Sequence, residues 1–148
     1  MTGKLILKSN CVILFEELKK AVDNYIKFGH TRGETQYINA FLAATIHSFL
    51  DYADRYLNKE DEKIQACRYV NNTLKHNISL VTHCKTVGGF TFPINFQHFV
   101  SPKIDVIWNY DESIKTRYED QQLAFKKLFA GKPIIDTLLP LASEIDDS

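Results

Sequence analysis

The sequence lacks the features that identify a secreted, membrane-spanning or metal-binding protein. Its three cysteines, Cys11, Cys67 and Cys84, are odd in number and far apart, and no Cys-x-x-C motif occurs. We therefore expect free, buried thiols in a reducing compartment. No apolar run approaches a membrane span of about 18 residues, and no apolar leader stands at the N-terminus, so we expect a cytoplasmic protein without a membrane segment. No two histidines have a metal-ligand spacing with a carboxylate between them, so we expect neither a metal nor a cofactor.

The sequence also lacks an excess of charge of either sign. Lys and Arg together number 18, as do Asp and Glu, which disfavours broad nucleic-acid binding and leaves room only for a local basic patch. By contrast, apolar residues make up 45% of the 148 residues and aromatic residues 12%. This is enough for a packed core without disulfides or metals, and the rings also suit self-association. We expect residues 1–148 to form one domain.

Apolar residues recur at steps of three and four along most of the chain, which predicts a mainly α fold, a bundle of about five helices. The predicted helices cover residues 11–28, 31–57, 58–77, 111–129 and 134–145, after an extended arm over 1–10. The second helix has a capping-box pattern in Thr31-Arg32-Gly33-Glu34, and Asn58 has the character of an N-cap for the third.

Between residues 79 and 108 the apolar period changes from helical to alternating, which predicts a small antiparallel β insertion, a hairpin or three strands. A first strand is predicted over 79–87, followed by a tight turn at Gly88-Gly89 and a second strand over 90–96. A third strand is predicted over 104–108. The three strands together have one aromatic face, which requires cover from the helices.

A polar cluster on the third predicted helix is the strongest candidate for a functional site. Arg68, Asn72 and His76 are spaced four residues apart, so each is displaced about 40° around the helix from the one before, and Lys75 flanks them. A His serves as general acid or base, an Arg binds a phosphate and stabilises its charge, and an Asn orients either. The set allows RNA cleavage without a metal, through His-assisted attack of a 2′-hydroxyl on the adjacent phosphate. Alternatively, it is the solvated side of a surface helix or a polar dimer contact, opposite an apolar stripe of Ile64, Cys67, Val70 and Leu74.

Two further polar residues lie on the second predicted helix. His47 and Asp51 are four residues apart, and they face His76 if the second and third helices pack together. A carboxylate beside a His sets its tautomer in an active site, and it also forms an ordinary structural hydrogen bond. We treat the two as supporting residues.

The stretch from Arg68 to His76, with its ending Asn-Thr-Leu-Lys-His, resembles the Arg-Asn-x-x-x-His-type motif of the HEPN superfamily. Members of that superfamily are small helical bundles that often dimerise, and many are metal-independent RNases of toxin–antitoxin, phage-defence or RNA-processing systems. The resemblance implies that Arg68 and His76 are the catalytic pair, that Asn72 is their polar neighbour, and that two copies meet across a dimer cleft. Arg68 stands farther from His76 than the family's Arg usually does, and the β insertion is not a general family feature.

Two functional hypotheses follow. The first is an RNA-acting, HEPN-like homodimer, a metal-independent endoribonuclease. The second is a non-catalytic module that binds itself or a partner protein through the polar helix face or the aromatic β element. The cluster on the third helix favours the first, and the neutral net charge favours the second.

Overall fold

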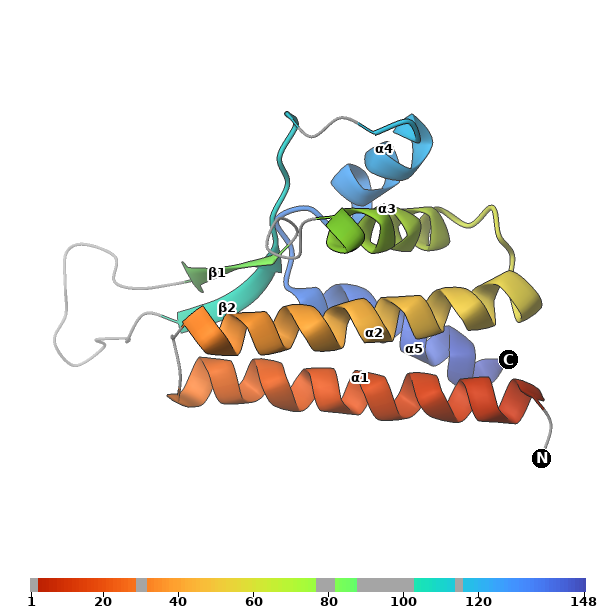
Figure 1. Cartoon of the computed structure of the whole chain (residues 1–148), viewed down its shortest axis with the longest axis horizontal. Coiled ribbons are helices and arrows are strands. Elements are labelled where there is room, and N and C mark those ends of the chain that lie inside the picture. Colours follow the sequence, from red (N-terminus) through yellow and green to blue (C-terminus); the bar gives the residue numbers. More distant parts are fainter. Residues whose placement is uncertain (1–2, 29–31, 77–81, 88–102, 114–115) are drawn as a thin grey trace, which may run out of the picture.

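The computed structural model describes residues 3–28, 32–76, 82–87, 103–113 and 116–148 of the chain (Figure 1). The elements of this part follow the order α1 (Gly3–Phe28), α2 (Arg32–Tyr56), α3 (Glu62–His76), β1 (Thr82–Val87), β2 (Lys103–Trp108), α4 (Glu119–Leu128) and α5 (Ile134–Asp147). The predicted fold class, a mainly α bundle of about five helices with a small antiparallel β element, is confirmed.

Two antiparallel helices, α1 and α2, form the long side of the molecule. Figure 1 shows α3 running back along α2, with α4 packed on α3 and α5 beside α1. The apolar stripes of all five helices meet in one core, whose largest fully buried side chains are Trp108, Tyr52, Phe125, Phe129, Leu18, Ile38, Leu42, Ile46, Ile134, Leu138, Leu141 and Ile145.

The β element is an antiparallel pair in which Thr82 of β1 faces Trp108 of β2 and Val87 faces Lys103. The strand predicted over 104–108 is therefore confirmed, as is the part of the first predicted strand over 82–87. The turn at Gly88-Gly89 and the strand over 90–96 lie outside the described residues.

The second strand, β2, is joined to the bundle at Trp108, whose ring is fully buried. Its indole Nε1 donates a hydrogen bond to Thr137 Oγ1 at 2.6 Å, and its ring stacks on Phe129 with centroids 5.1 Å apart. The Gly131 amide donates to the Trp108 carbonyl at 2.9 Å, and the φ of +77° at Gly131 suits a residue without a Cβ. The turn between α4 and α5 thereby fixes the end of the strand.

The extended arm predicted over 1–10 is wrong, because α1 is helical from Gly3. Leu7 packs against the core, and the Lys8 ammonium donates hydrogen bonds to the carbonyls of Asp146 at 2.9 Å and Ser148 at 3.2 Å. The Lys8 hydrogen bonds to α5 and the packing of Leu7 stabilise the first turns of α1, whose mixed sequence has no clear helical periodicity.

The predicted starts of two helices also need correction. The third helix begins at Glu62, not at residue 58, because the Asp61 carboxylate accepts the Lys63 amide at 2.8 Å in the manner of an N-cap. The helix predicted from residue 111 begins at Glu119, because Asp111 closes a local turn by accepting the amide and hydroxyl of Ser113. The capping box predicted at residues 31–34 lies outside the residues whose side chains are described.

Candidate functional site on α2 and α3

The Arg68 side chain is held between two helices. Its Nη2 donates a hydrogen bond to Oδ1 of Asp54 on α2, and the two side chains are 25% and 43% exposed. A guanidinium presents several N–H groups in a planar fork, so one contact with Asp54 leaves donors for another acceptor. The ion pair therefore positions Arg68 and leaves part of it open to solvent.

Asn72 lies on the other flank of the same face. Its Nδ2 donates to Oε1 of Gln121 on α4 at 3.1 Å, and the side chain is half-buried. The predicted apolar stripe is buried, and Ala66 and Tyr69 are buried with it because α4 covers a second side of α3. The polar face is thus narrower than a free helix surface and lies between α2 and α4.

The other two residues predicted on this helix lie at its C-terminal end. The Lys75 side chain is exposed. His76 is the last residue of α3, about 12 Å along the helix axis from Arg68 at a rise of about 1.5 Å per residue. The side chain of His76 lies outside the described part of the chain, so its role as general base stays a prediction.

The predicted His47–Asp51 pair forms on the exposed side of α2. Its Nε2 and Oδ2 atoms are 3.7 Å apart, and the side chains are 66% and 49% exposed. At that distance the contact is an ion pair when the imidazole is protonated, and it is too long for a hydrogen bond. Both residues line a groove of about 430 Å³ between α1 and α2, together with Asn10 and Ser48.

The Asp54–Arg68 ion pair joins the two helices that carry the predicted residues. Asp54 and Arg68 each lie seven residues from Asp61 in the connecting turn, and His47 and Lys75 each lie fourteen residues from it. At a rise of about 1.5 Å per residue, His47 lies about 10 Å along α2 from Asp54, and Lys75 lies about 10 Å along α3 from Arg68. We call His47, Asp51, Asp54, Arg68 and Lys75 the α2–α3 polar face.

Asp54 and Gln121 were not among the residues predicted from sequence. Asp54 gave no spacing signal, because it lies two residues before the end of α2 whereas Arg68 lies six residues after the start of α3. Gln121 gave no such signal, because its position depends on how α4 packs on α3 across the β element.

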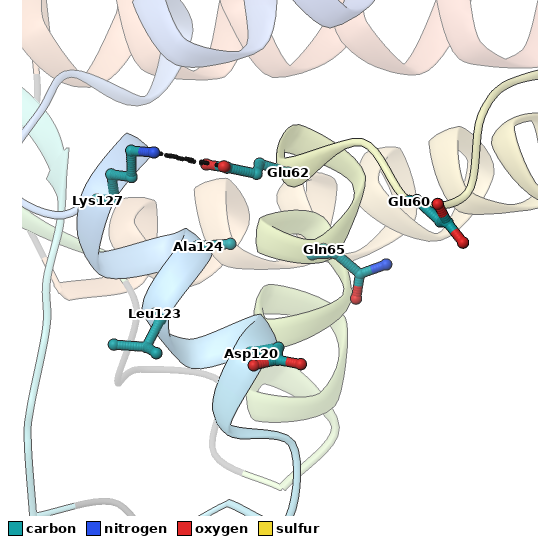
Figure 2. Close-up of a pocket in the computed structure, with 7 residues that line it drawn as sticks. All are labelled: Glu60, Glu62, Gln65, Asp120, Leu123, Ala124 and Lys127. Atoms are coloured by element: carbon teal, nitrogen blue, oxygen red, sulfur yellow. Dashed lines mark hydrogen bonds and ion pairs between the residues drawn. The ribbon is translucent and has the colours of Figure 1, made fainter.

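A second groove, of about 500 Å³, lies between α3 and α4 (Figure 2). Lys127 bridges to Glu62 at 3.1 Å at one end, and Asp120 lies at the other. Glu60 adds a third carboxylate, whereas the floor includes Ala124. A lining with three acidic groups and one paired cation repels phosphate, so this side of α3 is unsuited to a nucleic-acid backbone.

The described cysteines are free and buried, as predicted. Complete burial raises the pKa of Cys67 to about 12, and burial also raises the pKa of Cys11, which contacts the Ser48 hydroxyl at 3.3 Å. A thiol acts as a nucleophile through its thiolate, so neither residue is suited to covalent chemistry near neutral pH. The side chain of Cys84 lies outside the described residues.

Comparison of the chain with protein-family models, with curated proteins and with solved structures gives no match. Among the residues that the structure describes, no helix is long and apolar enough to cross a membrane. The same residues contain no group of three or more His, Cys, Asp or Glu side chains placed to hold a metal ion.

Proposed function

We propose that the protein acts on RNA as a HEPN-like, metal-independent endoribonuclease of the cytoplasm, of a defence or toxin–antitoxin type. The observation that carries the proposal is the placement of Arg68. Its guanidinium is held by Asp54 at the edge of a half-exposed polar face, with donors to spare, on the helix that also carries Asn72 and His76. An arginine fixed in place loses less side-chain freedom when it binds a phosphate than a free surface arginine does.

The reaction that these residues support is an internal transesterification. The imidazole of His76 accepts the proton of a ribose 2′-hydroxyl, the 2′-oxygen forms a bond with the adjacent phosphorus, and the bond from phosphorus to the 5′-oxygen breaks. Arg68 stabilises the charge that grows on the phosphate oxygens. Water protonates the leaving 5′-oxygen, and the His76 imidazolium then releases its proton to water. The products are a 2′,3′-cyclic phosphate and a free 5′-hydroxyl.

The charge distribution supports a local RNA contact. The chain has no net charge at neutral pH with its histidines uncharged, and the groove between α3 and α4 is acidic. RNA is therefore expected along the α2–α3 polar face, where Arg68 and Lys75 supply positive charge beside the carboxylates of Asp51 and Asp54. Because few phosphates are neutralised, the affinity should fall only modestly with salt, with a slope set by about two contacts.

The proposal is tested with the purified chain and a single-stranded RNA, in the presence of EDTA. Cleavage with 2′,3′-cyclic phosphate ends should persist in EDTA and be lost in His76→Ala, with a loss of about 10²-fold or more for Arg68→Ala. Arg117→Ala removes an exposed cation elsewhere and serves as the matched control, with activity retained. If wild type and His76→Ala leave the RNA equally intact and neither binds it, the proposal is wrong.

A second candidate is a non-catalytic module for protein–protein contact or dimerisation. The observation in its favour is the same ion pair, because Asp54 already occupies part of the Arg68 guanidinium that a phosphate would need. This alternative predicts that His76→Ala leaves RNA unaffected while substitutions on an exposed apolar surface abolish association.

A further inference from the structure

A pocket lies between the C-terminal half of α1 and the N-terminal half of α2. Figure 1 shows these two segments side by side at one end of the bundle. The pocket has a volume of about 340 Å³, and its lining combines apolar side chains with an amide, an amine and a carboxylate. Small-molecule sites range from about 300 to 1,000 Å³, so this volume suits one or two rings with short substituents. We call it the α1–α2 pocket.

The inner wall of the α1–α2 pocket is apolar. Tyr25 is buried, and Ala21 and Phe41 are half-buried against the core. The short side chain of Ala21 leaves space between the helices that a larger residue would fill. The wall therefore offers a ligand apolar and aromatic surface that is already held in place by the bundle.

Tyr37 stands at the mouth of the pocket with 67% of its surface exposed. With the other residues that the structure describes, it makes no ring contact, cation contact or hydrogen bond. Phe41 follows one turn later on the same side of α2. A planar ring that enters the pocket therefore meets an uncovered aromatic face at the mouth and a second ring deeper inside. Such faces stack on any nucleobase.

Three polar side chains follow one another along α1 at the rim. The exposed Asn24 amide has no partner among the described residues, and an amide supplies both the donor and the acceptor that the edge of a nucleobase requires. Lys20 and Glu17 lie about 6 and 10 Å from Asn24 along the helix axis. Their contact is long at 3.4 Å, and the two side chains are 69% and 45% exposed, so the Lys20 ammonium keeps donors for an anion.

These groups match the parts of one nucleotide. A base stacked on Tyr37 and Phe41 places its edge at Asn24. The ribose then lies toward Glu17, whose carboxylate accepts hydrogen bonds from the sugar hydroxyls, as acidic residues do in dinucleotide sites. The phosphate meets the Lys20 ammonium. We propose that the α1–α2 pocket binds a ribonucleoside monophosphate, either free or as the terminal nucleotide of an RNA chain.

The inference goes beyond the proposed RNA cleavage and does not depend on it. The pocket is lined by α1 and α2, whereas Arg68 is on α3. Along α2, the nearest residue of the α2–α3 polar face is His47, about 9 Å beyond Phe41. Arg68→Ala should therefore leave nucleotide binding in the pocket unchanged, and substitutions in the pocket should leave the Asp54–Arg68 ion pair intact.

The first experiment titrates the full chain with the 5′-monophosphates of adenosine, guanosine, cytidine and uridine in a calorimeter. At least one should bind with a Kd below about 1 mM, and ribose 5-phosphate, which lacks a base, should bind at least about 10-fold more weakly. Tyr37→Leu keeps an apolar side chain but removes the ring, and should weaken nucleotide binding about 5- to 100-fold. Tyr118→Leu removes a ring that is 48% exposed before α4 and should have no effect. No binding, or equal effects of the two substitutions in variants that fold by circular dichroism, would overturn the proposal.

The second experiment tests the polar contacts with the same titration. Lys20→Met should weaken binding of the nucleotide about 10-fold and leave binding of the nucleoside without phosphate unchanged. Lys59→Met removes an exposed cation before α3 and serves as its control. The ribonucleotide should bind more tightly than its 2′-deoxy form, and Glu17→Ala should remove that preference. Equal binding of the two sugars by the wild type would refute the ribose assignment.

The source of the nucleotide is read from a short RNA that begins with the preferred 5′-nucleotide. Equal affinity for this RNA and the mononucleotide indicates a free nucleotide as the ligand. Tighter binding of the RNA that Tyr37→Leu still weakens indicates the end of an RNA chain. If Arg68→Ala weakens binding of the mononucleotide as much as Lys20→Met does, the nucleotide lies on the α2–α3 polar face and the assignment to the pocket is wrong.

Discussion

Replacing Asp54 with asparagine is expected to strengthen RNA binding, because the Asp54 carboxylate competes with phosphate for Arg68. If a phosphate sits about 6 Å from that carboxylate, their repulsion is roughly 0.7 kcal/mol in water and about 3 kcal/mol at an effective dielectric constant of 20. Asp54 is 43% exposed, which places the effect near the lower value. Asp54→Asn should therefore tighten binding about 3- to 10-fold.

The fold should tolerate this substitution. A partly exposed ion pair contributes about 0.2–1 kcal/mol to stability, and the asparagine side chain can still accept a hydrogen bond from the guanidinium. The gain in affinity is therefore measurable on a folded protein.

The assay is fluorescence anisotropy with a 2′-O-methyl oligonucleotide, which binds but lacks the attacking hydroxyl, at about 50 mM salt. Asp23→Asn removes the same charge from an exposed position on α1 and controls for net charge. Arg68→Ala should weaken binding, and the double variant Asp54→Asn/Arg68→Ala should match Arg68→Ala. The reasoning is refuted if the double variant keeps the gain, or if the gain is equal in Asp23→Asn.

Three further predictions concern stability and reactivity. Trp108→Phe removes the hydrogen bond to Thr137 and part of a fully buried ring, and should lower the free energy of unfolding by about 2–4 kcal/mol in urea titrations followed by circular dichroism. Burial raises the pKa of Cys67 from 9.0 to about 12, so its thiol should resist iodoacetamide at pH 8 in the native chain and react in urea, as measured by peptide mass spectrometry. Because this thiol ionises at lower pH in the unfolded state than in the native state, the free energy of unfolding should fall as the pH rises from 9 towards 12. The hydrogen bond and ion pair with Glu144 raise the pKa of Lys63 above its ordinary 10.5. Their contribution to the stability of the fold is therefore complete below pH 10.5 and is lost as the pH rises through the native pKa. Thermal melts of wild type and Glu144→Gln should differ at pH 8 and converge in strongly alkaline buffer.

The helical content could be predicted from sequence because helix periodicity is local. The stripe of α3 is buried as its spacing indicated, and α2 and α5 lie within two residues of their predicted ends. Local patterns failed where a long-range contact or a side-chain turn decides the structure. Residues 3–10 are helical in contact with α5, and Asp111 delays α4 by closing a turn with Ser113.

In the candidate site, too, some features follow from local sequence spacing and others from tertiary contacts. The sequence by itself places Arg68, Asn72 and His76 on one side of a helix, because their spacing fixes their angles about its axis. Only the tertiary structure gives Arg68 its partner Asp54 and Asn72 its partner Gln121, since both contacts come from helices packed on either flank of α3.

The same division applies to α1. Its sequence determines that four apolar residues flank Ser9 symmetrically, since their positions along a helix follow from spacing alone. Burial depends on which neighbours cover each side, and Leu5, Ile6, Val12 and Ile13 stay exposed although α2 and α5 pack on α1. Spacing sets the direction of a side chain from its own helix, whereas what it meets there is decided by the rest of the chain.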